Sequence, residues 1–432
     1  MKERPTDSAA RQRGSLDNRI IVLRLLDHLA MGGVQKSVAT QLAHHDKERF
    51  RFLALTLKRR EAWPGCLEIP EFASSRLIPI RHSRDNAGIA ALARLLRREG
   101  VDILHCHSYF PNTVGRQAAL LAGVPVTIAH YHSTYGHRRD LAMAAWERVL
   151  FPFTSRALMV SSRAQSAWAG LTGLSTERTE IVSNLIDLSE MRAAAALPSP
   201  ALDQTLAQCQ PDWPLICSVG RLVPLKRTGD IIEAMAILKT RGRPARLVIA
   251  GEGPQRPILE QQIRRLGLAD RVRLLGCIDD VGPLLARAAA MTLASDVEGF
   301  SRCSLEAMAC AAPIITTPIG GVDEIDPKGE FLRLIPHRDP TALADALCDL
   351  WDHPEETARR IERASEAVGR FDCGPWVRRL ESIYEHEIKE AWLAKNRPWG
   401  YGGALAGGRL LAERLRWRLL RRLRPSSWEM PS

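Results

Sequence analysis

The sequence predicts an α/β protein with two Rossmann-like domains, each built on a parallel sheet. Three observations support this fold class. Short apolar runs alternate with helical patterns along most of the 432 residues. Polar residues gather where the apolar runs end, which is the edge where doubly wound sheets bind ligands. A stretch rich in proline, alanine and glutamine, residues 193–213, interrupts the alternation before it starts again.

The first series of elements opens with a strand at residues 19–26 and a turn containing Gly32 and Gly33. Two glycines between a strand and a helix let the backbone come close to a phosphate or a sugar. The turn lacks the full G-x-G-x-x-G fingerprint, so this signal is weak by itself. The other elements expected in this half are helices at 35–44 and 89–99, strands at 52–57, 103–107 and 126–130, and a helix–strand unit at 146–162.

Four histidines lie at the carboxyl ends of two predicted strands: His105, His107, His130 and His132. Ligands of doubly wound sheets bind at this edge, so the histidines are candidate site residues. The H-x-H pattern on one strand is not a zinc signature by itself, and no acidic residue adjoins the four. We therefore expect no metal ion.

The second series opens with a strand at residues 215–220, followed by Arg221 and, five residues later, Lys226. Two cations where a strand meets a helix can neutralise a diphosphate, each contact contributing about 1.5–3 kcal/mol. A pair of surface cations without a ligand is the alternative. The other elements expected in this half are helices at 230–239, 302–309 and 371–389, and strands at 246–250, 272–275, 291–294 and 314–316.

The stretch SDVEGFSRCSLEAMACAAPIITTPIGGVDEI, residues 295–325, organises the chain. Glu298 lies on a loop after a predicted strand, and Glu306 lies about one turn into the following helix, with seven residues between them. Both carboxylates can face the space above the helix N-terminus, where free backbone N–H groups favour an anion. For either glutamate alone, a solvated surface position is the alternative.

This pattern resembles the E-x7-E motif of the retaining glycosyltransferases of family 4, which have the GT-B fold. The resemblance extends, as a series of motifs in the family's order, over residues 22–380. It implies that Glu298 holds the donor sugar and that Glu306 holds the nucleotide ribose. It also implies that Gly33, Arg221 and Lys226 contact the donor diphosphate.

The resemblance implies further site residues. His132 matches the histidine that lies near the transferred sugar and the diphosphate, and with Glu298 it is the candidate catalytic pair. The backbone of Cys277 and Ile278 matches the segment that reads the base. Further candidates are Phe300 and Ser301 on the donor side, and His107 and Asn112 on the acceptor side. Ser301 stands where the family often has glycine, as do Ala311 and Leu185.

The basic excess is concentrated at the end of the chain. The net charge is +11, and from Lys395 onward nine basic and two acidic residues contribute +7 of it. On a helix, Leu411, Leu415, Leu419 and Leu423 would form a stripe opposite arginines. Such a segment can lie in an anionic membrane interface, and a solvated or protein-packed helix is the alternative. Because aromatic residues are not interleaved with the basic ones, we expect no nucleic acid partner.

Composition places the protein among ordinary globular chains, with 45% hydrophobic and 25% charged residues. We expect no membrane-spanning helix and no secretory signal, because no apolar run of about 18 residues occurs and the first residues are polar. Nine scattered cysteines without a C-x-x-C pair indicate a reducing cytoplasm. We expect a cytoplasmic protein whose tail offers a route to the inner face of the membrane.

The expected organisation has six parts: a flexible N-terminal tail at 1–18, an acceptor domain at 19–197, a linker at 198–213, a donor domain at 214–370, a helix returning to the first domain at 371–394, and a basic tail at 395–432. The resemblance implies transfer of a sugar, with retention, from a nucleotide diphosphate sugar to a hydroxyl of a saccharide or lipid-linked acceptor. Bacterial surface polysaccharide or glycolipid synthesis is the expected setting, and no cofactor is expected. The alternatives are a nucleotide-sugar 2-epimerase, a non-catalytic sugar-nucleotide-binding subunit and a nucleic-acid-binding protein.

Overall fold

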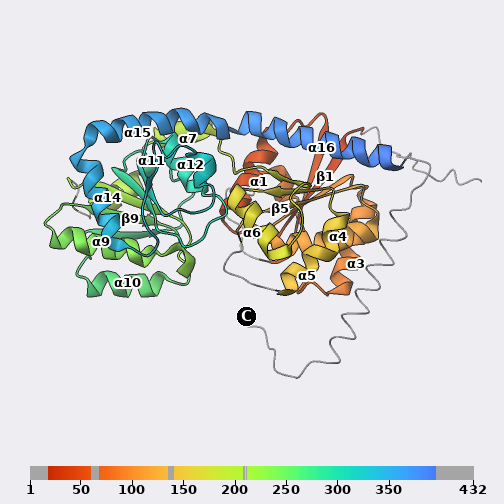
Figure 1. The fold of residues 1–432 in the computed structure, drawn as a ribbon, viewed down its shortest axis with the longest axis horizontal. Helices are drawn as coiled ribbons and strands as arrows, with labels where there is room; N and C mark the ends of the chain where they lie inside the picture. The colour runs from red at the N-terminus through yellow and green to blue at the C-terminus, as the bar shows by residue number, and fades with distance from the viewer. Residues whose placement is uncertain (1–17, 60–67, 135–140, 208–209, 211, 396–432) are drawn as a thin grey trace, which may run out of the picture.

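The computed structural model describes residues 18–59, 68–134, 141–207, 210 and 212–395, which form two lobes (Figure 1). The predicted N-terminal tail, up to residue 17, and the basic tail, from residue 396, lie outside the described residues. No helix of the described residues is both long enough and apolar enough to cross a membrane.

The first lobe contains a seven-stranded sheet in which all neighbouring strands pair in parallel, in the order β3-β2-β1-β4-β5-β6-β7. From β1 the strand order continues to β2 and β3 on one side, and from β4 it continues to β5, β6 and β7 on the other. The carboxyl ends of β1 and β4 are therefore the topological switch point of this sheet. The strands are β1 (Ile20–Leu26), β2 (Phe50–Thr56), β3 (Arg76–Leu77), β4 (Ile103–His107), β5 (Val126–Tyr131), β6 (Arg156–Met159) and β7 (Thr179–Ile181).

The second lobe repeats this plan with a six-stranded parallel sheet in the order β10-β9-β8-β11-β12-β13. Its switch point lies between β8 and β11. The strands are β8 (Leu215–Val219), β9 (Arg246–Ala250), β10 (Val272–Gly276), β11 (Ala290–Leu293), β12 (Ile314–Thr316) and β13 (Arg333–Leu334). The prediction of an α/β protein with two Rossmann-like units is confirmed.

Helices cover both faces of the two sheets (Figure 1). In the first lobe they are α1 (Gly33–His44), α2 (Pro70–Ala73), α3 (Asn86–Arg98), α4 (Tyr109–Ala122), α5 (Leu141–Leu150) and α6 (Ser162–Thr172). The remaining helices are α7 (Leu188–Ala195), α8 (Pro200–Ala207), α9 (Thr228–Thr240), α10 (Arg256–Arg265), α11 (Gly282–Leu285), α12 (Arg302–Ala309), α13 (Val322–Ile325), α14 (Pro340–Asp352), α15 (Pro354–Ala367) and α16 (Cys373–Lys395). Short 3-10 turns occur at Phe151–Phe153, Pro224–Lys226 and Val368–Phe371.

The alternation of side chains along β1 shows how each sheet is buried on both sides. Leu23 and Leu25 pack with side chains of α3 and α4, while Val22 and Leu26 pack with α1 and α16. Arg24 lies on the same side as Val22 and Leu26, because successive strand residues point to opposite faces. A charged residue is therefore placed inside the face that α1 and α16 cover.

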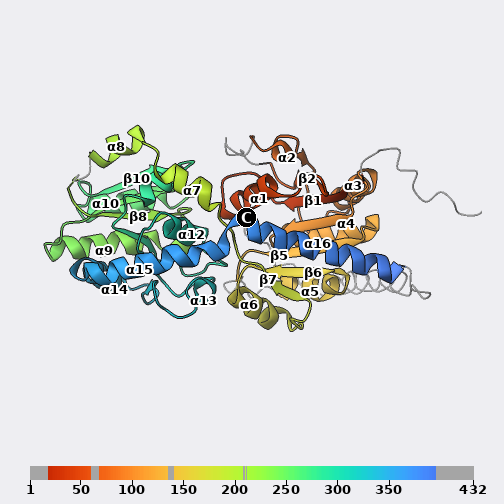
Figure 2. The ribbon, with the colours of Figure 1, turned by 90° about the horizontal axis from the view of Figure 1, so that it is seen from above.

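Helix α16 returns from the second lobe to the first, as predicted for the last helix, and lies along the first lobe (Figure 2). Trp376, Leu380 and Tyr384 are buried in the same apolar cluster as residues of β1, β2 and α1. The two passages of the chain between the lobes lie side by side, because Ile186 pairs with Asp372 and its N–H donates to the Phe371 carbonyl at 3.0 Å.

The stretch expected as a linker contains helix α8 (Pro200–Ala207), and helix α7 precedes it. Helix α7 packs against α11 and α12, and Leu202 and Leu206 of α8 are buried in the apolar cluster of the second lobe. The prolines at residues 198, 200 and 211 suggested an irregular connection, yet Pro200 stands at the first position of α8, where proline is tolerated. The helices α4, α6, α10, α14 and α15 were not anticipated from the sequence.

Candidate active site

The loop after β11 brings the two lobes into contact. Ser161 donates its hydroxyl to the Gly299 carbonyl at 2.7 Å, and the Asn184 side-chain amide donates to the Phe300 carbonyl at 2.9 Å. A Cβ on Gly299 would lie 2.3 Å from the His132 carbonyl oxygen, and one on Gly320 would lie 2.4 Å from the Glu298 carbonyl oxygen. Only glycine permits this approach. His132 and Glu298 are therefore brought to the same place between the lobes.

Glu298 and Lys226 form an ion pair at the switch point of the second sheet. Ser295 also donates its hydroxyl to the same Glu298 oxygen, at 3.1 Å. The side chains of Lys226 and Glu298 are 19% and 17% exposed. Burial alone would lower the pKa of Lys226, but the Glu298 carboxylate outweighs it and raises that pKa above its ordinary value. Lys226 is therefore charged at neutral pH, with its charge neutralised by a residue of the candidate site.

Arg221 and Arg227, the two arginines near Lys226 in the sequence, differ in whether a carboxylate pairs with them. Arg227 is held by Asp230 through two hydrogen bonds of 2.8 and 2.9 Å. Arg221 is exposed, and within the described part of the chain no carboxylate forms an ion pair with it. Arg221 is thus available to an anion, whereas Arg227, which lies beside Lys226 in the sequence, is committed to α9.

The two residues just before the E-x7-E helix, Phe300 and Ser301, have mainly structural contacts. The Ser301 hydroxyl caps α12 by accepting from the Ser304 N–H at 3.3 Å. The Phe300 ring is buried and packs against the Phe371 ring, with 5.6 Å between the ring centroids. The side chains of Phe300 and Ser301, predicted on the donor side, are thus used inside the protein, so a donor contact there would fall to their backbone.

Glu306 is 5% exposed and accepts a hydrogen bond from Arg302 at 3.0 Å. Arg302 also lies 3.5 Å from the Ser37 hydroxyl and 3.4 Å from the Leu185 carbonyl, both in the first lobe. Leu185, which stands where glycine was expected, is fully buried in the apolar cluster of that lobe. Arg302 therefore connects the second glutamate of the motif to α1.

The glycine turn of the first lobe faces the predicted base-reading segment of the second. The Lys36 ammonium donates to the Asp279 carbonyl at 3.0 Å, and the Cys277 sulfur lies 3.1 Å from the Met31 sulfur. A Cβ on Gly33 would meet no atom of the described residues within 4 Å, so the space beside this turn is open. The segments containing Gly33, Cys277 and Ile278 thus belong to one edge between the lobes.

A group of buried histidines surrounds Arg24. Its guanidinium lies 2.8 Å from His45 Nε2, 2.5 Å from His105 Nδ1 and 3.4 Å from His107 Nε2. Beyond these rings, His105 reaches His130 at 3.3 Å and His107 reaches His132 at 3.1 Å. On the far side, His45 Nδ1 lies 2.9 Å from Glu381, and the Tyr384 hydroxyl lies 2.7 Å from His105 Nδ1. We refer to Arg24, His45, His105, His107, His130 and His132 as the histidine cluster.

The histidine cluster is arranged around a cation of the protein itself. The ligand atoms of His105, His107 and His130 lie within 4.8 Å of one another, which would suit a metal ion. However, the Arg24 guanidinium faces lone pairs of His105 and His107, and its positive charge opposes a second cation there. As arranged, these imidazoles serve as acceptors for Arg24.

The two acceptor-side candidates are not exposed. His107 is 1% exposed and Asn112 is fully buried, with its amide donating to the His130 carbonyl at 3.2 Å. Both side chains are enclosed by the protein, and their acceptor-side role stays a prediction. Sequence reasoning also missed Arg24, Ser295 and Arg302. The signal for Arg24 was a charged residue inside the apolar strand IIVLRLL.

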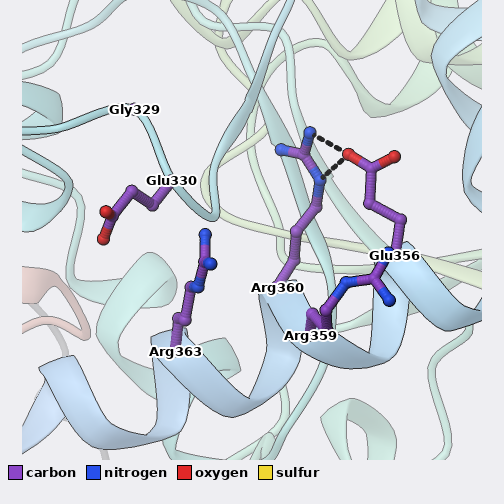
Figure 3. Close-up of a pocket in the computed structure, with 6 residues that line it drawn as sticks. All are labelled: Gly329, Glu330, Glu356, Arg359, Arg360 and Arg363. Atoms are coloured by element: carbon purple, nitrogen blue, oxygen red, sulfur yellow. Dashed lines mark hydrogen bonds and ion pairs between the residues drawn. The ribbon is translucent and has the colours of Figure 1, made fainter.

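A hollow of about 370 Å³ lies away from these residues, against α15 (Figure 3). Its lining is strongly charged, and Arg360 is paired with Glu356 at 2.6 Å. It contains no residue predicted for the site. The lining residues are Gly329, Glu330, Glu356, Arg359, Arg360 and Arg363.

Two Rossmann-like lobes thus meet at the loop after β11, which carries Glu298 of the Lys226–Glu298 pair. Residues 22–190 match the family model described as Glycosyltransferase Family 4, and residues 213–353 match the one described as Glycosyl transferases group 1. The chain belongs to this family: it is a retaining glycosyltransferase with the GT-B fold that transfers a sugar from a nucleotide sugar. This assignment favours the transferase over the epimerase, binding-subunit and nucleic-acid-binding alternatives.

Two similar proteins illustrate the breadth of the family. N-acetyl-alpha-D-glucosaminyl L-malate synthase of Bacillus anthracis is 27% identical over 311 residues, covering 71% of this chain and 80% of that protein. Phosphatidyl-myo-inositol mannosyltransferase of Mycobacterium leprae is 25% identical over 337 residues, covering 74% and 85%.

Solved structures with the same fold include Anabaena HepE in complex with UDP-glucose, with a TM-score of 0.73, 21% identity, and coverage of 85% of this chain and 100% of that one. The lipopolysaccharide-biosynthesis glycosyltransferase WaaG has a TM-score of 0.64 and 17% identity, with coverage of 84% and 99%. At these identities the likeness establishes the fold.

The histidine cluster predicts a dependence of stability on pH. Burial, and then the Arg24 charge, lower the pKa of His45 to about 4, even though Glu381 opposes the shift. Below its ordinary pKa near 6.5, the unfolded chain therefore binds a proton at His45 that the folded protein does not bind. The contribution of neutral His45 to the free energy of unfolding is fully present above pH 6.5. It is lost as the pH falls toward 4, by about 1.4 kcal/mol per pH unit.

Urea unfolding of the wild-type protein and of His45→Gln, at about pH 7.5 and about pH 5.5, measures this effect. The wild-type free energy of unfolding should fall more steeply toward acid than that of the variant. Equal pH slopes for the two proteins would show that His45 is already protonated in the folded state.

Proposed function

We propose that this transferase uses a uridine diphosphate sugar and moves the sugar to a hydroxyl of a saccharide or lipid-linked acceptor. The observation that carries the proposal is the Lys226–Glu298 pair at the switch point of the second sheet, beside His132. Bound UDP-glucose in the structurally similar Anabaena HepE supports uridine as the base. The acceptor class is supported by the phosphatidyl-myo-inositol mannosyltransferase among the relatives.

In this proposal the diphosphate replaces Glu298 as the partner of Lys226. Arg221 is exposed and Lys226 carries a charge neutralised only by the protein, so both can turn to a diphosphate. The N-terminus of α12 adds partial positive charge. Glu298, once released, accepts hydrogen bonds from hydroxyls of the donor sugar, and Glu306 acts on the nucleotide side. The cations and the helix stabilise the charge that develops on the leaving diphosphate, and no metal ion takes part.

His132 completes the proposed site from the first lobe. Burial, and then Arg24, lower the pKa of His132 to about 3, so the imidazole is neutral at physiological pH. A neutral imidazole can donate one hydrogen bond to an oxygen of the sugar or the leaving phosphate without adding a fixed charge. The acceptor hydroxyl would approach from the first lobe and attack on the face from which the diphosphate leaves, which retains the configuration.

The binding of UDP tests the roles proposed for Arg221 and Lys226. Arg221→Ala and Lys226→Ala should each weaken UDP binding by about 1.5–3 kcal/mol, because each removes a charge-assisted contact. Isothermal calorimetry with UDP measures the affinity, and Arg264→Ala, an exposed arginine at the end of α10, is the matched control. Wild-type affinity in both site variants would remove Arg221 and Lys226 from the diphosphate site. Tighter binding of GDP or ADP by the wild-type protein would overturn the choice of uridine.

Glu298→Gln should separate binding from transfer. The substitution removes the charge that competes for Lys226, so UDP affinity should be retained or increased. Transfer should fall by about ten- to a hundredfold, because a charged hydrogen-bond acceptor for the sugar is lost. The measurements are the initial rate of transfer from a UDP-sugar and the affinity for UDP. Transfer at the wild-type rate would contradict the role of Glu298.

We also propose that the basic tail holds the enzyme at an anionic membrane surface, where surface polysaccharide or glycolipid precursors are made. The support is its net charge of +7 and its leucine spacing. Replacing Arg414, Arg418 and Arg421 together by glutamate should abolish most co-sedimentation with vesicles containing anionic lipid. Salt should weaken the wild-type interaction. Equal sedimentation of both proteins, or none by the wild type, would contradict this role.

A further inference from the structure

Arg24 imposes a direction on every hydrogen bond of the histidine cluster. A guanidinium carries only donors, so each imidazole nitrogen that faces it must be an acceptor. The three nitrogens are His45 Nε2, His105 Nδ1 and His107 Nε2, at 2.8, 2.5 and 3.4 Å. A neutral imidazole with an acceptor on one nitrogen carries its proton on the other. The proton of each ring therefore points away from Arg24.

The contact of His45 with Glu381 checks this argument independently. The proton on His45 must be on Nδ1, and Nδ1 lies 2.9 Å from the Glu381 carboxylate. A carboxylate accepts and does not donate when ionised, and the pKa of Glu381 is lowered. The Tyr384 hydroxyl, which can donate or accept, lies 2.7 Å from the acceptor nitrogen of His105. The directions required by Arg24 thus agree with the partners supplied by α1, β4 and α16.

The same logic extends to the outer two histidines. The His105 proton is on Nε2, which lies 3.3 Å from His130 Nδ1. The His107 proton is on Nδ1, which lies 3.1 Å from His132 Nε2. Both receiving nitrogens must accept, so His130 carries its proton on Nε2 and His132 carries its proton on Nδ1. His130 Nε2, like His132 Nδ1, is buried without a hydrogen-bond partner among the described residues.

His132 ends the chain with a donor that is buried and has no partner. Its Nδ1 atom forms no hydrogen bond with any of the described residues. An unpaired buried N–H is costly, and a ligand that brings an acceptor oxygen relieves that cost. His132 adjoins the loop of Glu298 and Gly299, where the proposed donor substrate lies.

We propose that Arg24 is a positioning residue that, through His107, fixes His132 as the Nδ1–H tautomer and so makes it a hydrogen-bond donor at the site. The ligand group recognised there is an acceptor oxygen, either of the donor sugar or of its phosphate. In this tautomer His132 Nδ1 has no lone pair and cannot act as a base toward the acceptor hydroxyl. The identity of the ligand rests on the proposed function, whereas the tautomer does not.

The test is the tautomer of His132 in the ligand-free full-length protein labelled with ¹⁵N-histidine. Two-bond ¹H–¹⁵N spectra distinguish a protonated from an unprotonated ring nitrogen, and His132→Gln assigns the signal. Wild-type His132 should carry its proton on Nδ1 near neutral pH. A proton on Nε2 would overturn the proposal.

A matched pair of variants at His107 tests the relay without removing Arg24. His107→Asn keeps a donor near the Nδ1 position, and His132 should retain the Nδ1–H tautomer. His107→Leu removes the donor, and the Nε2–H tautomer of His132 should become populated, with kcat lowered by about tenfold while KM for the UDP-sugar changes less. The Asn variant should recover most of kcat. An unchanged His132 tautomer in folded His107→Leu would overturn the relay.

Arg24→Met tests whether Arg24 sets the direction of the hydrogen bonds in the histidine cluster. The tautomers of His45, His105 and His107 should then become mixed in the spectra, and identical spectra would exclude Arg24 as the cause. If this variant does not fold, the His107 pair still decides the proposal. If the tautomers are as expected but His132→Gln leaves UDP-sugar binding and transfer unchanged, the function proposed for His132 fails and the tautomer assignment stands.

Discussion

A buried positive charge in the middle of β1 is the constraint on which the first lobe depends. An isolated guanidinium in an apolar interior is strongly unfavourable, and Arg24 is fully buried. Its charge is met by imidazole lone pairs from α1 and β4, and beyond His45 by the Glu381 carboxylate. Since Glu381 belongs to α16, the last helix supplies the nearest negative charge of this network to the first strand. The return of α16 is therefore an electrostatic requirement as well as an apolar one.

The second constraint is the narrow space between the lobes. The loop after β11 passes so close to His132 that residue 299 has no room for a Cβ, and residue 320 has none beside the Glu298 carbonyl of the same loop. This closeness places Glu298 and Lys226 of one lobe beside the end of the histidine cluster of the other. Lys226 and Glu298 form an ion pair there. Such a pair keeps Lys226 charged in a partly buried position.

The paired passages between the lobes link these two constraints. Ile186 and Asp372 lie in register, and the Leu188 N–H donates to the Asp372 carboxylate at 3.2 Å. Arg302 adds a contact from the helix of the E-x7-E motif to α1. The geometry of His132 relative to Glu298 thus depends on a few polar contacts between the lobes, while each lobe keeps its own apolar core.

The sequence alone determined the α/β class, the two parallel sheets, most strands to within one or two residues and the E-x7-E helix. These features follow from local periodicity, since each run of side chains must bury one or both faces of its own element. The local pattern could not reveal that residues 200–207 form a helix against the second lobe, because proline and alanine suit both a helix start and a connection. It also could not show that Phe300 and Ser301 turn inward, or that His107 and Asn112 are buried. Those outcomes, like the pairing of Lys226 with Glu298 and the gathering of histidines around Arg24, join residues that are far apart in the chain. Only the tertiary structure decided them, because a hydrogen bond or an ion pair depends on which side chains the packing brings within about 3 Å of one another.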